Sequence, residues 1–186
     1  MIDVVYVTGN ANKAKYFTRM TKMDIPHMSF DVDEIQSTSI SEIVEHKARQ
    51  AYILAKRPVI VEDTKLSFRV LGALPGPLIK WFFQELGEEG LCRLLDSYND
   101  RTAFAGAAIA YFDGVNLKIF ERELEGTIAK VPSKNNTGFG WNTIFVPNGA
   151  KTTLADMTEK EFEKYYAKIK PFDEVSEFLK NKRKRD

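Results

Sequence analysis

Val61-Glu62-Asp63-Thr64 continues the apolar run Pro58-Val59-Ile60 and ends it in two adjacent carboxylates. A buried strand that stops at two adjacent carboxylates would present them at the carboxyl edge of a sheet, where open α/β folds bind their ligands. Two unpaired carboxylates are costly to bury, so they require a metal ion, a cationic side chain or water. The pattern therefore predicts a strand over residues 58–62 with Asp63 at the centre of a polar site.

A second strand, Val4-Val5-Tyr6-Val7, runs into the polar loop Thr8-Gly9-Asn10-Ala11-Asn12-Lys13, and a helical pattern follows. This arrangement suits a phosphate site, because the N-terminus of a helix attracts anions. The loop lacks the second glycine and the Gly-Lys-Ser/Thr ending of a Walker A loop. The alternative is an ordinary tight turn capped by Asn10, with Lys13 in solvent. An acidic edge beside a phosphate cradle indicates magnesium-dependent chemistry on phosphates.

Three further charged residues are candidates for the same site. Glu34 precedes the second predicted helix and is either a surface acid or, with Asp63, an oxygen ligand of Mg²⁺, which one or two carboxylates usually hold. Lys47 falls on the apolar stripe of the helix predicted over residues 40–56, so it reaches either solvent or a phosphate. Lys80 follows the rigid turn Leu74-Pro75-Gly76-Pro77 and is either a surface lysine or a phosphate clamp.

The stretch Gly138-Phe139-Gly140-Trp141-Asn142 joins a flexible turn to two aromatic residues. One interpretation is a glycine turn whose aromatic side chains belong to the core. The other is an aromatic platform on which a nucleotide base stacks, an interaction worth about 1–3 kcal/mol.

Composition bounds the class of protein. The chain has 186 residues, 44% of them hydrophobic, which suffices for one domain or for two lobes that share a core. Its 27 Lys and Arg against 26 Asp and Glu give no charge argument for a nucleic-acid binder. Cys92 is the single cysteine, so no internal disulfide forms. No apolar stretch approaches the roughly 20 residues of a membrane span, and the first strand leaves no room for a signal peptide. We therefore expect a soluble, cytoplasmic protein without membrane contact.

The pattern along the chain predicts an α/β fold with a mixed, twisted sheet. Antiparallel strands are expected to turn at Asp113-Gly114, capping boxes to start two helices at Ser39 and Thr158, and Pro171 to kink or split the last helix. Strands are predicted over 3–8, 58–62, 103–112, 116–125, 127–131 and 143–146. Helices are predicted over 12–22, 40–56, 77–86, 88–95 and 159–180.

These pieces occur together and in order in one known family. The chain resembles the inosine triphosphate pyrophosphatases, also called the Ham1 or non-standard purine nucleoside triphosphate pyrophosphatases. The similarity extends over almost the whole chain, from Val4 to about Met157. The stretches that carry it are Val7–Lys13, Val61–Thr64, Gly72–Phe82 and Phe139–Trp141.

The resemblance implies one elongated α/β domain over residues 1–186, in which two lobes share a long mixed sheet flanked by helices, and it implies a homodimer. It implies hydrolysis of a nucleoside triphosphate to the monophosphate and pyrophosphate, with Mg²⁺ or, as a substitute, Mn²⁺. The usual substrates are ITP, dITP and XTP, so the expected function is to clear such nucleotides from the cellular pool.

Carried over residue by residue, the resemblance assigns Glu34 and Asp63 to the metal ion. The expected catalytic residues are Asp63, Glu62 and Lys13, with Asp63 or Glu62 accepting the proton of the attacking water. Phe139 is expected to stack on the base. The residues expected to contact the substrate are Thr8, Gly9, Asn10, Lys13, Lys47, Asp63, Thr64, Lys80, Phe139, Gly140, Trp141, Asn142 and Lys168.

The chain departs from the family where the base is read. Asn142-Thr143 replaces the family's usual Asp-Pro pair, and Tyr166-Ala167-Lys168 falls, counted without gaps, where the family has Ser-His-Arg. An amide in place of a carboxylate adds hydrogen-bond donors to a group that only accepted. We therefore expect a protein that still cleaves triphosphates but reads a different base, or reads the base loosely.

Other functions compete with this one. A non-catalytic nucleotide-binding protein fits the loss of the base-reading element, but pure binding does not require a metal-held water. A pyrophosphatase acting on a pyrimidine or a modified nucleotide fits the same residues. Nucleic-acid binding through the basic tail, Lys180–Arg185, is the least supported, because a solvated chain end explains the tail equally well.

Overall fold

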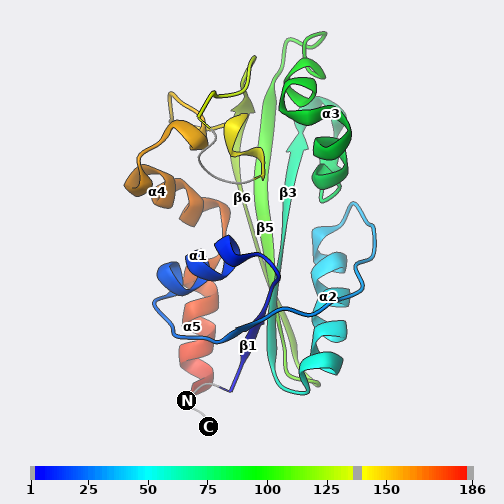
Figure 1. The fold of residues 1–186 in the computed structure, drawn as a ribbon, viewed down its shortest axis with the longest axis vertical. Coiled ribbons are helices and arrows are strands. Elements are labelled where there is room, and N and C mark those ends of the chain that lie inside the picture. The colour runs from blue at the N-terminus through cyan, green and yellow to red at the C-terminus, as the bar shows by residue number, and fades with distance from the viewer. Residues whose placement is uncertain (1–2, 136–139, 184–186) are drawn as a thin grey trace.

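The fold is organised around one mixed sheet of seven strands, seen in the computed structural model of the chain, which describes residues 3–135 and 140–183 (Figure 1). The strand order is β2-β1-β3-β5-β6-β7, and β4 pairs with β3 on the same side as β1. β2, β1 and β3 are parallel, and the remaining pairs are antiparallel. The strands are β1 (Val5–Val7), β2 (His27–Met28), β3 (Val59–Phe68), β4 (Pro75–Gly76), β5 (Thr102–Phe112), β6 (Leu117–Ile128) and β7 (Phe145–Pro147).

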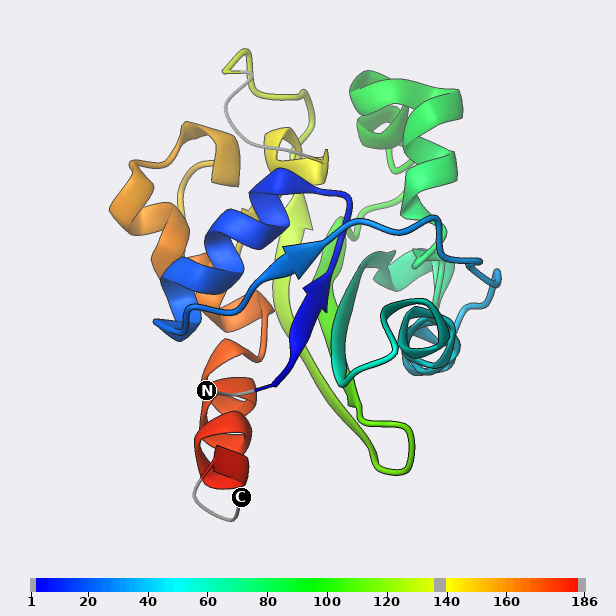
Figure 2. The same ribbon diagram turned by 60° about the horizontal axis from the view of Figure 1, so that its bottom comes forward.

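Helices cover both faces of this sheet, which confirms the predicted α/β class. α1, α4 and α5 lie on one side, whereas α2 lies on the other, so that the sheet separates α1 from α2 (Figures 1 and 2). Within the described residues, no helix combines the length and the apolar character that a bilayer crossing requires. The helices are α1 (Ala11–Thr21), α2 (Ile40–Ala55), α3 (Ile79–Arg93), α4 (Glu159–Ile169) and α5 (Phe172–Arg183).

β3 is the central strand for the site, and it is longer than predicted. The expectation that it ends at the carboxylates is wrong, because β3 continues to Phe68 and Asp63 pairs with Ala108 of β5. The carboxylates still lie at an edge. On the other side of β3, β1 pairs only as far as Ile60, and β4 begins only at Leu66. In the described part of the chain, residues 61–65 therefore form an open stretch of strand edge.

The alternation of side chains along β3 separates two hydrophobic clusters. Ile60 and Leu66 belong to the larger cluster, on the side of α1, α4 and α5. Val59 and Val61 belong to the smaller one, where they pack with α2. Because successive residues of a strand point to opposite faces, the adjacent carboxylates that follow Val61 must point to different sides of the sheet.

Caps and prolines set the helix boundaries largely as predicted. Thr158 and Glu161 form the expected reciprocal capping box at the start of α4. At α2 only half of the box forms: the Ser39 hydroxyl accepts from the backbone of Glu42, whose carboxylate instead accepts from Ser37. Pro171 splits the last predicted helix into α4 and α5, as expected.

The break predicted between the helices over 77–86 and 88–95 is confirmed, because α3 is interrupted at Gly87, whose φ of 64° is not helical. The boundaries predicted for two further strands are wrong. The strand predicted over 127–131 is the end of β6, which extends to Ile128. β7 begins at Phe145, two residues later than predicted, because Gly140–Thr143 forms a short 3₁₀ turn.

Asp113 fixes the hairpin between β5 and β6, at the turn predicted from the sequence. Its Oδ1 accepts the backbone N–H groups of Val115 (3.1 Å) and Asn116 (2.7 Å), and Gly114 takes a φ of 96°. The Lys182 ammonium of α5 donates to Oδ2 at 2.7 Å. Burial opposes ionisation, but these hydrogen bonds outweigh it and hold the pKa of Asp113 well below its ordinary value. One carboxylate thus ties the hairpin to the C-terminal helix.

We expect Asp113→Asn to lower the free energy of unfolding by about 1–2 kcal/mol at neutral pH, since a charge-assisted network is lost. A carboxylate with a depressed pKa stabilises the fold above its unfolded pKa. The deficit should therefore shrink as the pH falls below 3.8, the ordinary value for aspartate. Urea melts across this pH range measure the effect, with the exposed Asp24→Asn as the control. A deficit that does not change with pH would contradict the electrostatic explanation.

Candidate functional site

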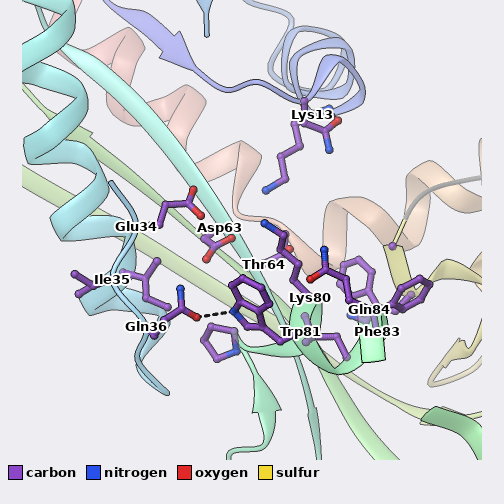
Figure 3. A pocket seen from close by; sticks show the side chains of 16 residues that line it. Lys13, Glu34, Ile35, Gln36, Asp63, Thr64, Lys80, Trp81, Phe83 and Gln84 are labelled. Atoms are coloured by element: carbon purple, nitrogen blue, oxygen red, sulfur yellow. Dashed lines mark hydrogen bonds between the residues drawn. The ribbon is translucent and has the colours of Figure 1, made fainter. Parts of the chain in front are cut away.

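The open stretch of β3 forms the floor of a cleft. Two adjoining cavities, of about 450 and 440 Å³, share the side chains of Asn10, Lys13, Glu34 and Asp63, and we refer to them together as the cleft. One cavity is mainly polar and lies against the loop after β1. The other extends toward the start of α3 (Figure 3). Twelve of the sequence-predicted site residues line the cleft: Thr8, Gly9, Asn10, Lys13, Glu34, Lys47, Glu62, Asp63, Thr64, Lys80, Gly140 and Trp141.

The loop after β1 is both a capped turn and a wall of the cleft. Asn10 caps α1, and its Oδ1 accepts the backbone N–H groups of Asn12 (2.9 Å) and Lys13 (3.2 Å). Thr8 Oγ1 accepts the backbone N–H of Asn10 at 3.1 Å. The backbone N–H groups of Asn10, Asn12 and Lys13 are therefore already engaged within the turn. The Lys13 side chain is only 15% exposed and lines both cavities, so it is not a solvated surface lysine.

Glu62 and Asp63 have opposite electrostatic environments. Glu62 is buried on the α1 side, where its Oε1 binds Lys170 and lies 3.5 Å from Lys13 Nζ, and its Oε2 accepts from the Tyr6 hydroxyl at 3.1 Å. Burial works against the charged form, but the two ammonium groups outweigh it and lower the pKa of Glu62. A carboxylate stabilised in this way is a poor proton acceptor.

Asp63 shows the reverse balance, because its charge is incompletely compensated. Burial raises its pKa, the Glu34 carboxylate adds to the rise, and Lys13 and Lys47 only partly oppose it. A carboxylate with a raised pKa is a stronger base and a better target for a cation. Of the two adjacent acids, Asp63 is thus the one equipped for chemistry.

Glu34 provides the second carboxylate of the cleft. It forms an ion pair with Lys47 of α2, which lowers its pKa against the effect of burial, and Lys80 and Lys13 act in the same direction. Figure 3 shows Glu34 and Asp63 side by side beneath the Lys13 side chain. Among the described residues, no group of three or more His, Cys, Asp or Glu side chains is arranged so that it could hold a metal ion. Two carboxylates nevertheless fit a cation that takes its other ligands from phosphate and water.

The second cavity has an apolar wall at the start of α3. Pro77, Ile79 and Phe83 line it, together with Ile35 from the loop opposite. Trp81 Nε1 donates to Gln36 Oε1 at 2.7 Å, and this bond joins the two sides of the cleft (Figure 3). This bond could not be predicted from the sequence, because neither Trp81 nor Gln36 stands out by its spacing.

The residues predicted to read the base do not all lie in the cleft. Phe139 lies outside the described residues. Asn142 is buried and lines neither cavity, and Lys168 is exposed on α4 with its Nζ 5.3 Å from the Tyr165 ring centroid, away from the cleft. Tyr166 is buried in the aromatic core, where its ring stacks on Phe162 with centroids 5.0 Å apart.

The 3₁₀ turn at Gly140–Thr143 carries buried polar atoms that the described residues do not satisfy. Trp141 Nε1, Asn142 Nδ2 and Thr143 Oγ1 have no hydrogen-bond partner among them. An unsatisfied buried donor costs about 1–3 kcal/mol, so three in succession require an explanation such as a ligand or ordered water.

Three lysines facing two carboxylates at the broken edge of an α/β sheet are typical of proteins that bind phosphates together with a metal ion. The comparisons with known proteins agree with this class. The chain belongs to the Ham1 family, whose model matches residues 4–178.

Relatives and solved structures support the assignment along the whole chain. The chain is 37% identical to the inosine triphosphate pyrophosphatase of Schizosaccharomyces pombe, over 86% of this chain and 85% of that protein. It is 36% identical to the inosine triphosphate pyrophosphatase of Candida albicans, over 96% and 98%. Its fold is similar to the Ham1 protein of Staphylococcus aureus, with a TM-score of 0.80, 22% identity and coverage of 96% and 99%.

We expect Asp63→Asn and Glu62→Gln to change stability in opposite directions in the absence of ligand. Asp63→Asn removes an incompletely compensated charge and should raise the Tm by about 2–4 °C. Glu62→Gln leaves Lys170 buried without its partner and should cost about 3–5 kcal/mol. Thermal melts at neutral pH measure both.

The gain in Asp63→Asn should shrink as the pH falls through the raised pKa of Asp63 and disappear below 3.8, the ordinary aspartate value, because Asp63 is then protonated in the folded and the unfolded chain alike. Two variants that shift the Tm in the same direction would contradict the assigned environments.

Proposed function

We propose that this chain is a nucleoside triphosphate pyrophosphohydrolase, which cleaves a non-standard purine nucleotide such as ITP, dITP or XTP to the monophosphate and pyrophosphate. Membership of the Ham1 family supports the reaction, and the named relatives are inosine triphosphate pyrophosphatases. The observation that carries the proposal is the environment of Asp63. A carboxylate of raised pKa lies in a cleft that also holds three lysines.

The polar cavity is the proposed triphosphate site. Lys13, Lys47 and Lys80 offset the charge of the phosphates and of the leaving pyrophosphate. Asn10 contributes its side-chain N–H groups, because its Oδ1 is committed to the helix cap. Glu34 and Asp63 are the residues that would hold the cation, which we propose to be Mg²⁺, with Mn²⁺ as a substitute. When bound there, the cation supplies charge stabilisation of the phosphate oxygens and a lower pKa for a bound water.

Asp63 is the proposed general base. It accepts the proton of the attacking water at a carboxylate oxygen, because Asp63 lines both cavities, whereas both oxygens of Glu62 are engaged by Lys170, Lys13 and Tyr6. The sequence left the choice between the two open. Lys13 lies between them and balances charge on both sides of the strand. A homodimer, which the family resemblance implies, stays a prediction.

The apolar cavity is the proposed base site. Trp141 and the wall at the start of α3 provide the surface for stacking, and the unsatisfied donors of the 3₁₀ turn provide polar contacts. Asn142 follows Trp141 and lines neither cavity, so its contact with a base requires the turn to shift when the ligand binds. Its amide then both donates and accepts and tolerates more than one base edge, whereas a carboxylate only accepts. We therefore propose a broader base preference than a carboxylate at this position would give.

The reaction is tested with a panel of ITP, dITP, XTP, the four standard NTPs and their deoxy forms, each with Mg²⁺. Pyrophosphate and orthophosphate are assayed separately. We expect pyrophosphate, with the highest kcat/KM for the non-standard purines. Asp63→Asn should lose about 10²–10⁴-fold in kcat, the usual contribution of a general base, while remaining folded. Nucleotide binding without any hydrolysis would instead support the non-catalytic alternative.

Asn142→Asp should sharpen the choice of base. Adenine presents an acceptor at N1, which a carboxylate repels, whereas hypoxanthine presents an N–H donor there. The ratio of kcat/KM for ITP over ATP should therefore rise about tenfold or more. Asn148→Asp makes the same chemical change at an exposed position after β7 and serves as the control. An unchanged ratio in Asn142→Asp would show that this side chain does not contact the base.

A further inference from the structure

Lys170 is a wholly buried lysine that the reaction described above does not use. Its side chain is 0% exposed, and its Nζ lies 4.5 Å from the ring centroid of Tyr166. Its position follows from the sequence. The residue before a proline is excluded from the helical conformation, so Pro171 ends α4 and Lys170 is extended, with φ −119° and ψ 136°. The side chain therefore enters the core between α4 and α5.

The Lys170 ammonium meets a carboxylate that also faces the cleft. It donates to Glu62 Oε1, the same oxygen from which Lys13 Nζ lies 3.5 Å away. The Glu62 side chain is 1% exposed, whereas Lys13 is 15% exposed and lines both cavities. Glu62 is thus a buried anion with one cation behind it in the core and one cation in front of it in the cleft.

Lys170 affects the charge of the cleft, because it compensates the Glu62 carboxylate. One cation is enough to compensate one buried carboxylate, and Lys170 is the cation in direct contact with Glu62. The charge of Lys13 is then left over for an anion. Lys47 cannot take over the role of Lys13 in binding an anion, because the Lys47 ammonium is paired with the Glu34 carboxylate. Without Lys170, Lys13 would be the one cation that the described residues place beside Glu62, and Glu62 would compete with phosphate for it.

We propose that Lys170 is a positioning residue, which neutralises Glu62 from within the core and thereby leaves the Lys13 ammonium free to bind the phosphates of the substrate. The proposal rests on the proposed function in one respect, namely that the ligand carries phosphates. It concerns affinity for phosphate and makes no claim about the chemical step. It can therefore be tested by binding alone, independently of whether the chain hydrolyses any nucleotide.

The probe is inorganic pyrophosphate, added to the full chain in EDTA at constant pH and ionic strength. Both tryptophans of the chain line the cleft, so their fluorescence reports the titration, and calorimetry checks the Kd. The variants are Lys170→Met, which removes the inner cation, and Glu62→Gln/Lys170→Met, which removes the pair. The matched control is Lys182→Met, which breaks the lysine–carboxylate pair with Asp113, far from the cleft but likewise beside an aromatic ring.

We expect Lys170→Met to weaken pyrophosphate binding about tenfold, because Lys13 is drawn to Glu62. The double variant should return to within about threefold of the wild-type Kd, because Glu62 no longer competes for Lys13 and the influence of Asp63 and Glu34 on Lys13 is the same as in the wild type. Lys182→Met should lower the Tm and leave the Kd unchanged. Recovery in the double variant is the decisive result, since a purely structural role of Lys170 gives no reason for it.

Three results would overturn the proposal: an unchanged Kd in Lys170→Met, a double variant that binds as weakly as Lys170→Met, or a Kd equally weakened in Lys182→Met. If Lys170→Met does not fold, the double variant decides, because it buries no unpaired charge. A Kd raised tenfold there overturns the proposal, and a wild-type Kd supports it. The nucleotide panel stands apart from these results, so the proposed reaction and the role of Lys170 can fail separately.

Discussion

The site depends on one constraint, which is that successive side chains of a β-strand point to opposite faces of the sheet. Glu62 and Asp63 are adjacent in sequence, yet one faces the core beneath α1 and α5 and the other faces the cleft beside α2. Cations compensate both charges. Lys170 meets Glu62 from within the core, and Lys13 acts on both carboxylates from the cleft, where β3 is unpaired between β1 and β4. A fully paired strand at this place would bury both charges with no approach for a ligand.

Much of the architecture could be predicted from local chemistry, because the deciding interactions are short in sequence. The Thr158 capping box, the turn at Asp113 and the break at Pro171 are each set by a few neighbouring residues. The length of β3 could not be predicted in this way. Residues 62–65 are polar, and only their pairing with the alanine-rich β5, more than forty residues away in sequence, makes them a strand.

The candidate site shows the same division between local and distant causes. The loop at Asn10 and the carboxylate at Asp63 could be chosen from spacing, and both line the cleft. Lys170 could not be chosen from the sequence, because a lysine in a charged C-terminal segment is ordinarily solvated. Pro171 indicates a break in the helix, but it does not indicate which side chain enters the core. The choice between Glu62 and Asp63 also required the structure, since only the buried partners of Glu62 show that its charge is already compensated.

The C-terminal segment contacts the part of the site around Glu62, although the sequence predicted a role for this segment at the base. The resemblance assigns this segment to reading the base, but here Tyr166 packs into the aromatic core and Lys168 points away from the cleft. Lys170, two residues further on, instead reaches the phosphate half from behind through Glu62. A segment committed to the core at Tyr166 and Lys170 cannot also move toward a base without exposing an ion pair and an aromatic cluster. The ion pair and the aromatic cluster therefore constrain the sequence of this segment.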